Sequence, residues 1–173
     1  VPDAANGATL GTASLEFADL FLHDGAQILF GADQDVVLTH AADAGLTLKT
    51  ATTSDDTKAT LTLQTGDTDI AVNDVLGQLH FQAPDEGAGT DAILVAAGIA
   101  AISEGDFSAS NNATKLSFQT GASEAASEKM SLSSAGILTV ADDIIIGDGK
   151  TIGSVSDPDA ITIASNGQLT LTQ

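Results

Sequence analysis

The sequence predicts an all-β protein made of short strands with little helix, and three observations support this fold class. Short runs of aliphatic and β-branched residues recur along all 173 residues, separated by Gly, Asn, Asp and Ser. Within several runs Thr alternates with Leu or Ile, as at Ile161–Ile163 and Leu169–Leu171. Only 3% of the residues are aromatic, and much of the hydrophobic content is Ala. We therefore expect half-buried strands around a thin or oligomeric core.

The expected strands follow one another from end to end of the chain. In order they cover residues 26–30, 35–40, 46–50, 59–64, 79–83, 115–120, 129–132, 137–140, 143–146, 160–164 and 168–172. A helix of one or two turns is expected at residues 14–20, where Ser14 is a capping candidate and apolar residues follow at near-helical spacing. Residues 91–103 are apolar on every face, so their pattern fits either a buried strand or a short buried helix.

A repeat links the two ends of the chain and predicts a modular organisation. Six positions in the first copy match six positions placed 124 residues later, and each copy then runs into a strand led by Gly. The matching residues are Asp24-Gly25, Ile28, Asp33, Asp35 and Val37 in the first copy, and Asp148-Gly149, Ile152, Asp157, Asp159 and Ile161 in the second. We expect an N-terminal β module with a short helical turn (1–58), a central β module (59–140) and a C-terminal β repeat (141–173) that echoes residues 24–48.

The charge balance excludes two classes of partner. The chain has 24 acidic residues, five Lys and no Arg, with a net charge of -19, and its pI is about 4.1. Without Arg, Trp or Tyr it lacks the side chains that commonly grip phosphates and stack on bases, so we expect no nucleic-acid partner. No run of about 18 apolar residues occurs, so we expect no membrane insertion.

The mean hydropathy of +0.18 is too high for a chain kept unfolded by charge. Because the chain begins with Val1 rather than Met, we expect a fragment or a processed product.

No catalytic motif is complete, so we expect no enzymatic activity and no catalytic or cofactor-binding residue. Gly147-Asp148-Gly149-Lys150-Thr151 matches the end of a phosphate-binding loop, but the first Gly position of that motif holds Ile144. We expect a tight turn there instead, with Gly at positive φ. The chain has no Cys and no Gly-x-Ser-x-Gly motif, and its three His lie in or beside strand patterns. His80 should point away from the strand face that holds Leu79 and Phe81.

The acidic turns are the main metal-ligating candidates; His80 is a second candidate if its copies meet on the axis of a trimer. Calcium takes six to eight oxygen ligands, and Asp-x-Asp turns supply some of them. The alternative is that these residues are solvated, since Asp favours turns by bonding its own backbone. No EF-hand loop is present. The calcium candidates are Asp33, Asp35, Asp67, Asp69, Asp157 and Asp159.

The central module carries four motifs in a recognisable order. They are Gly77-Gln78-Leu79-His80-Phe81, Ala97-Gly98-Ile99-Ala100-Ala101-Ile102, Leu116-Ser117-Phe118-Gln119-Thr120 and Lys129-Met130-Ser131-Leu132-Ser133-Ser134-Ala135-Gly136. This series resembles the repeated β-rich module of bacteriophage tail fibres and related host-specificity proteins. Residues 10–22 are also similar to a Leu-Gly-Ser-x-x-x-x-Trp-x-x-Leu-Tyr segment of those proteins, with Phe17 and Phe21 at the Trp and Tyr positions.

The resemblance implies an elongated, interwoven homotrimeric fibre of β-prism or β-helix type. It implies a location in the virion tail, other tail proteins as partners, and a host surface receptor, including a glycan, as the target of attachment. Members of this group often end in a self-cleaving chaperone domain, and nothing like that domain precedes Gln173. Two alternatives stay open. One is a calcium-stabilised cell-surface adhesin or extracellular filament subunit, and the other is a polysaccharide-degrading tailspike segment, which needs a carboxylate pair that the sequence does not single out.

Overall fold

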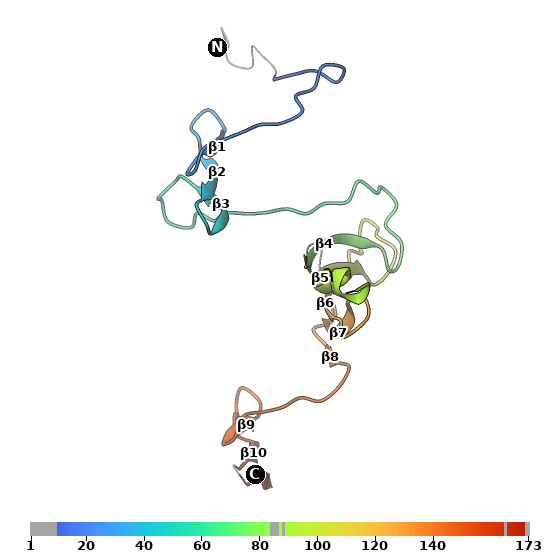
Figure 1. Ribbon diagram of the computed structural model, residues 1–173. Coiled ribbons are helices and arrows are strands. Elements are labelled where there is room, and N and C mark those ends of the chain that lie inside the picture. The colour runs from blue at the N-terminus through green and yellow to red at the C-terminus, as the bar shows by residue number, and fades with distance from the viewer. Residues whose placement is uncertain (1–9, 84–86, 88, 165, 172–173) are drawn as a thin grey trace. The chain divides into compact units, whose positions relative to one another are not determined.

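The computed structural model describes residues 10–83, 87, 89–164 and 166–171, and within them the chain is all-β, with three antiparallel sheets (Figure 1). The chain divides into two units, residues 1–62 and 63–173. The one helical element of the described residues is a single 3-10 turn, Asp91–Ile93. The all-β fold class predicted from the sequence is therefore confirmed.

The N-terminal sheet is a three-stranded meander in the order β1-β2-β3. Its strands are β1 (Gln27–Phe30), β2 (Val36–Ala41) and β3 (Gly45–Thr50). Ile28 pairs with Leu38 and Leu38 pairs with Leu48, so aliphatic side chains share one face. The three strands match the predicted runs to within one residue at each end.

The central sheet is a five-stranded antiparallel meander in the order β4-β5-β6-β7-β8. Its strands are β4 (Val75–Gln82), β5 (Val95–Ser103), β6 (Thr114–Thr120), β7 (Ser127–Leu132) and β8 (Leu138–Val140). The ambiguous run 91–103 is thus mainly strand, because β5 lies between two neighbours and pairs with β4 and β6 along its length.

The C-terminal sheet repeats the three-stranded meander in the order β9-β10-β11. Its strands are β9 (Lys150–Ile152), β10 (Ile161–Ile163) and β11 (Leu169–Leu171), each of three residues. The register differs from that of the N-terminal copy. Ile28 pairs with Leu38, whereas Ile152 pairs with Ile161, the counterpart of Val37. The repeat therefore preserves topology but shifts the first strand pair by one residue. Thr172, included in the last predicted strand, lies outside the described residues.

Three sequence predictions were wrong. Residues 14–20 form no helix; instead a tight turn joins Thr12 to Leu15, and the Thr12 hydroxyl accepts a 3.1 Å hydrogen bond from the Leu15 amide. A local side-chain bond of this kind competes with helix formation, and so short a segment has little helical stability of its own. Residues 59–64 and 143–146 form no strand, because no described segment pairs with their backbones. Strand propensity indicates that a segment can pair, but it does not supply the partner.

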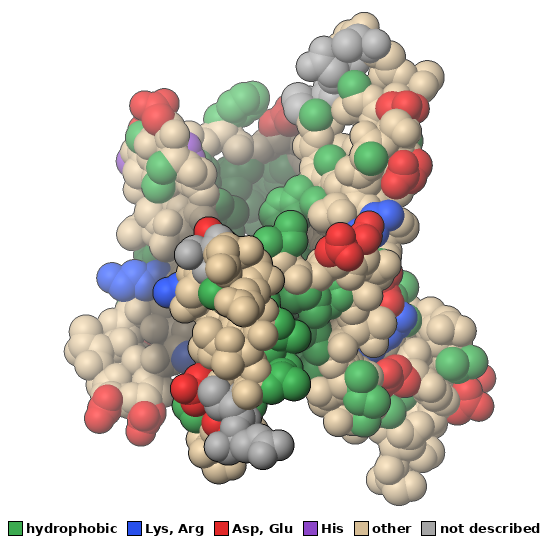
Figure 2. Space-filling view, turned by 90° about the horizontal axis from the view of Figure 1, so that it is seen from below, with side chains coloured by type: hydrophobic (Ala, Val, Ile, Leu, Met, Phe, Trp, Pro, Cys, Tyr) green, Lys and Arg blue, Asp and Glu red, His purple; other side chains and the backbone are tan. Residues whose placement is uncertain are grey.

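The core of the described chain is as thin as the composition predicts. Among the described residues only two hydrophobic ones are buried, Val37 and Ala100, at 8% and 2% exposure. Hydrophobic side chains instead lie open at the surface of the sheets and linkers (Figure 2). In the part of the chain that the structure describes, each sheet is a single layer, and no second sheet or helix of its own unit packs over it to bury an apolar face. Domains normally bury such faces between two layers.

Candidate functional site

The most extensive candidate site is one face of the central sheet, which we call the apolar face. Strand register places residues of five strands in common rows, and the rows on this face hold aliphatic, aromatic and small side chains. One row is Leu79, Ile99, Phe118, Met130 and Val140, and the next is Gly77, Ala101, Leu116, Leu132 and Leu138. A third row, on the other side of the first, begins with Phe81 and Ala97 and ends with the polar residues Thr120 and Ser127. No charged residue occupies these positions.

The apolar face is largely open in the single chain. Leu79 is 46% exposed, Phe81 56% and Leu138 58%, and Leu116 and Leu132 each exceed 40%. Burying one such side chain fully stabilises a protein by about 1.5–3 kcal/mol. Scattered exposed Leu residues are ordinary, but a face of adjacent ones marks an interaction surface.

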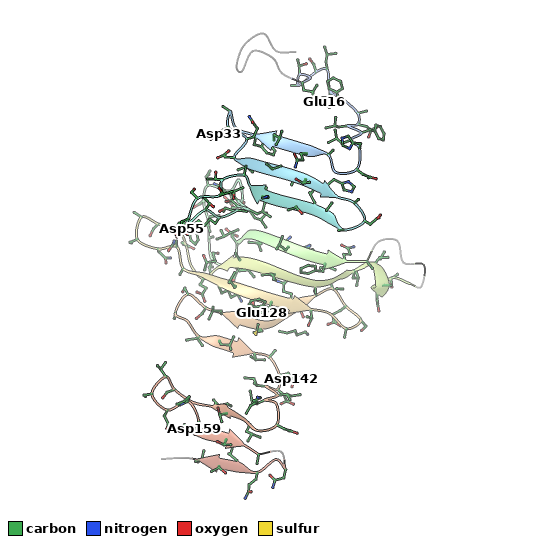
Figure 3. The ribbon with its side chains drawn as sticks, turned by 90° about the vertical axis from the view of Figure 1, so that its left-hand side faces the viewer. Glu16, Asp33, Asp55, Glu128, Asp142 and Asp159 are labelled. Carbon is green, nitrogen blue, oxygen red and sulfur yellow. The ribbon has the colours of Figure 1, made fainter. Side chains whose placement is uncertain are left out.

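The opposite face of the same sheet is polar, and it is the better covered of the two. The Lys115 ammonium lies 2.8 Å from the Glu128 carboxylate. On the same face Ser117 is fully buried and Ser131 is 8% exposed. The hydrogen bond from Lys115, with smaller contributions from Ser117 and Ser131, lowers the pKa of Glu128 (Figure 3). His80 lies on this face, paired with Gly98, as predicted. Short side chains beside long charged ones therefore produce burial without an apolar core.

The end of β5 is anchored by a buried serine. Ser103 is 1% exposed, its hydroxyl donates to the Ala71 carbonyl, and it accepts a 2.9 Å bond from the Asp74 amide. The backbones of Ser103 and Asp74 bond to each other at 2.9 Å, and the Asp106 carboxylate accepts from the Val72 amide at 3.2 Å. This network ties the turn before β4 to the loop after β5. Sequence reasoning missed Ser103, which ends an apolar run with nothing to indicate a long-range partner.

The C-terminal sheet repeats the segregation of side chains on a smaller scale, whereas the N-terminal sheet does so only in part, since Leu29 and Val37 share a face with Thr39. In the C-terminal sheet, Ile152, Ile161 and Leu171 share a row, and so do Thr151, Thr162 and Thr170, on opposite faces. The aliphatic row is open, with Ile152 46% and Leu171 68% exposed. A further row with Ile163 and Leu169 carries Lys150 at its end.

The N-terminal unit holds a shallow pocket of about 280 Å³ over its aliphatic face. Leu20, Leu22 and His23 of the segment before β1 line it, together with side chains of all three strands. His40 lies on the rim, 3.7 Å from the carboxylate of Asp24, and both side chains are largely exposed. The pocket offers mainly aliphatic contact, with the His40–Asp24 pair beside it.

The six calcium candidates occupy turns, and the structure brings some of them together in pairs. The carboxylates of Asp33 and Asp35 both lie beside Gly31, between β1 and β2, where an added Cβ would come within 3.1 Å and 2.8 Å of their oxygens. Asp67 accepts a 3.0 Å bond from the Asp69 amide, a turn-forming contact. Asp157 donates its amide to Ser154, and Asp159 lies in the turn before β10 (Figure 3). Among the described residues no three His, Cys, Asp or Glu side chains lie close enough to hold a metal ion together.

The loop expected at Gly147-Asp148-Gly149-Lys150 is a tight turn. The Lys150 amide donates to the Gly147 carbonyl at 3.1 Å, and Gly149 has a φ of 69°. The predicted turn and its positive-φ glycine are confirmed. The segment leads into the strand β9. A nucleotide-binding loop would instead lead into a helix.

Comparison with known protein families and with curated proteins matches neither a family model nor a curated protein to this chain. The described residues include no helix long and apolar enough to cross a membrane. The most extensive candidate site is thus the exposed apolar face of the central sheet, in a chain with a net charge of -19.

Proposed function

We propose that this protein is a structural, non-enzymatic segment of a bacteriophage tail fibre, a shaft or receptor-presenting piece, that assembles with copies of itself. The observation that carries the proposal is the open apolar face of the central sheet, repeated on a smaller scale in the C-terminal sheet. A single-layer sheet gains stability when that face is covered. Copies of the same chain supply the cover in this account.

A homotrimer is the assembly we propose, an interwoven fibre of β-prism or β-helix type. The central sheet mixes large side chains with Gly77, Ala97 and Ala101 on its apolar face, and small residues let chains approach closely. The face carries no charge, although each chain has a net charge of -19. Charge kept to other surfaces lets copies associate despite their mutual repulsion, and salt should strengthen association by screening that repulsion.

The location and the outer partners rest on the resemblance of residues 77–136 to tail-fibre modules. In this account the assembly lies in the virion tail, contacts other tail proteins at its ends and presents its loops to a host surface receptor, with a glycan as one class of target. Fold alone does not specify a receptor.

The test is the native mass in solution, measured by light scattering behind a sizing column. The proposal expects three times 17.3 kDa at micromolar concentration, in calcium and in chelator alike. A monomer at every concentration and salt level would overturn it.

The adjacent carboxylates of Asp33 and Asp35 favour the alternative of a calcium-stabilised cell-surface adhesin or extracellular filament subunit. In that case chelator would dissolve the assembly and calcium would restore it. An Asp33→Asn/Asp35→Asn variant would then remain dissociated in calcium. An Asp55→Asn/Asp56→Asn variant alters another acidic turn and would reassemble in calcium like the unmodified protein.

A further inference from the structure

The linker before the central sheet contains a strand sequence that the single chain leaves unpaired. The tripeptide Leu-Thr-Leu occurs three times, at Leu46–Leu48, Leu61–Leu63 and Leu169–Leu171. The first copy lies in β3 and the last forms β11. The middle copy has no helix, turn or strand, and within the described part of the chain no backbone group of residues 58–64 makes a hydrogen bond (Figure 1).

The paired copies show which kind of neighbour this tripeptide takes. In both, the central Thr lies opposite another Thr: Thr47 opposite Thr39, and Thr170 opposite Thr162. In β11 both flanking Leu residues lie opposite Ile, whereas in β3 Leu48 lies opposite Leu38 and Leu46 opposite His40. The neighbour shared by both copies is therefore an aliphatic residue followed by Thr, and in β11 it is a full aliphatic-Thr-aliphatic strand.

One strand at the free edge of the central sheet has that sequence. It is β8, Leu138-Thr139-Val140, which pairs with β7 on one side only. Leu138 and Val140 continue the apolar face, and Thr139 continues the polar one. An exposed strand edge is a template for pairing with another chain.

Within its own chain, Leu63 lies beside β4, the edge of the central sheet opposite to β8. Leu63 lies against Gly77 in β4, so closely that a Cβ on Gly77 would come within 2.8 Å of the Leu63 Cβ. β4 is the opposite edge of the sheet, and four strand spacings put β8 about 19 Å away. The Leu63 side chain already lies on the side of the apolar face, as it would if Leu61–Leu63 extended that face.

We infer that Leu61–Leu63 adds as a sixth strand to the β8 edge of a second copy of this chain, with Thr62 beside Thr139. The inference rests on the proposed self-assembly and specifies one contact within it. Each copy then gives a linker strand and receives one, so the sheets of neighbouring copies are joined by backbone hydrogen bonds. Leu61, 69% exposed in the single chain, and Leu63, 44% exposed, join the buried apolar face.

The chain has no Cys, so a pair of introduced cysteines reports on this contact cleanly. Residues directly opposite on neighbouring strands lie about 4.5–5.5 Å apart between Cα atoms, within the span of a disulfide. The Thr62→Cys/Thr139→Cys variant should form disulfide-linked oligomers under mild oxidation. The control Thr62→Cys/Ser123→Cys, with its second cysteine in the exposed loop between β6 and β7, should not. Oligomers from Thr62→Cys alone would show that linkers pair with each other and would overturn the β8 assignment.

Hydrogen exchange on the unmodified protein gives a second readout that needs no variant. Amides of residues 61–63 should exchange about 100-fold or more slowly than an open chain in the assembled protein, and lose that protection when the assembly is diluted to monomer. A trimeric mass with fast exchange and no cross-link would overturn this inference and leave the proposed function standing. A monomeric mass at all concentrations would overturn both, and slow exchange in the monomer would show that the linker pairs within one chain.

Discussion

The central and C-terminal sheets share one plan of side chains but differ in how each is held together. Both are antiparallel meanders with an aliphatic face and a polar face. The central sheet has five strands of three to nine residues and the long-range network around Ser103. The C-terminal sheet has three strands of three residues, and its tight turns bond over short sequence distances.

The difference predicts a gradient of stability along the chain. Three short strands with one uncovered apolar face are marginal alone, because few contacts offset the entropy of ordering the backbone. The central sheet has more contacts to set against that entropy. The terminal sheets should therefore depend on assembly for their order, while the central sheet can keep its structure in a single chain.

A charge on the apolar face of the central sheet should have the largest effect. Leu79→Asp places a carboxylate where a second copy would cover it, and burying an unpaired charge is very costly. We expect assembly to weaken by at least about 100-fold, measured by light scattering over a dilution series, while the strand signal of the central sheet persists. The control Gln78→Asp, on the opposite face of the same strand, should leave the mass unchanged; equal loss in both variants would contradict a face-specific contact.

Removal of the Ser103 hydroxyl should have the next largest effect, and only on the central sheet. Ser103→Ala deletes the bonds to Ala71 and Asp74 with little change of volume. We expect a loss of about 1–2 kcal/mol in urea unfolding, since two hydrogen bonds are lost and the Asp74 amide and Ala71 carbonyl keep only their 3.3 Å bond to each other. Ser123→Ala, in an exposed loop, should change stability by less than about 0.5 kcal/mol. A neutral Ser103→Ala variant would show that the network does not hold the sheet.

One turn geometry, present in both sheets, allows the same substitution to be compared in each. Gly136 donates to Ser133 and Gly167 to Ala164, both at 2.9 Å, and both glycines have a φ of 79°. Neither would meet a neighbour on gaining a Cβ. Alanine at either position costs about 1 kcal/mol through backbone strain alone.

The consequences of that common strain should differ between the two sheets. Gly136→Ala should shift the unfolding midpoint of a central sheet that stays folded. Gly167→Ala should abolish exchange protection of β9–β11, because that sheet has little stability to lose. Equal losses of protection in both sheets, measured by hydrogen exchange, would remove the proposed gradient.

The smallest effect concerns the ion pair on the polar face. The pKa of Glu128 is lowered from its ordinary value of 4.5, so its stabilisation is present above that pH and is lost as the pH falls through the lower folded value. With side chains 28% and 34% exposed, the pair should contribute no more than about 0.5 kcal/mol. Glu128→Gln should flatten the fall in central-sheet stability below pH 4.5, and Glu16→Gln should not. A profile unchanged by Glu128→Gln would remove the pair from the account.

The strand runs of the sheets could be predicted from the sequence because alternation and turn residues act locally. The Leu-Thr-Leu and Ile-Thr-Ile runs of β3, β10 and β11 show this. The side chains that share each face of the central sheet could not be predicted from the sequence, because they depend on cross-strand register. Register shifts near Leu76 and Lys129 change which residues share a face, and no local pattern announces them. The same limit explains the failed strand at residues 59–64, whose sequence indicates pairing but not a partner.

The calcium candidates show that the sequence can predict neighbouring carboxylates within one turn but not a complete set of metal ligands. Asp33 and Asp35 are close in sequence and in space, so a turn pattern could place them together. A third carboxylate must come from elsewhere in the chain, and spacing alone cannot predict that. The sequence therefore identifies acidic turns well and a ligand set poorly.

The measurement that tests the central claim most directly asks which face of the central sheet is covered in solution. Single-cysteine variants Leu79→Cys and Gln78→Cys place a thiol on the apolar and the polar face of the same strand in a chain without other cysteines. The account predicts that a water-soluble maleimide labels the Gln78→Cys variant rapidly and the Leu79→Cys variant much more slowly, and that dilution to monomer abolishes the difference. Equal labelling of both variants at concentrations where the native mass is a multiple of 17.3 kDa would contradict it, because the assembly would then form without covering the apolar face.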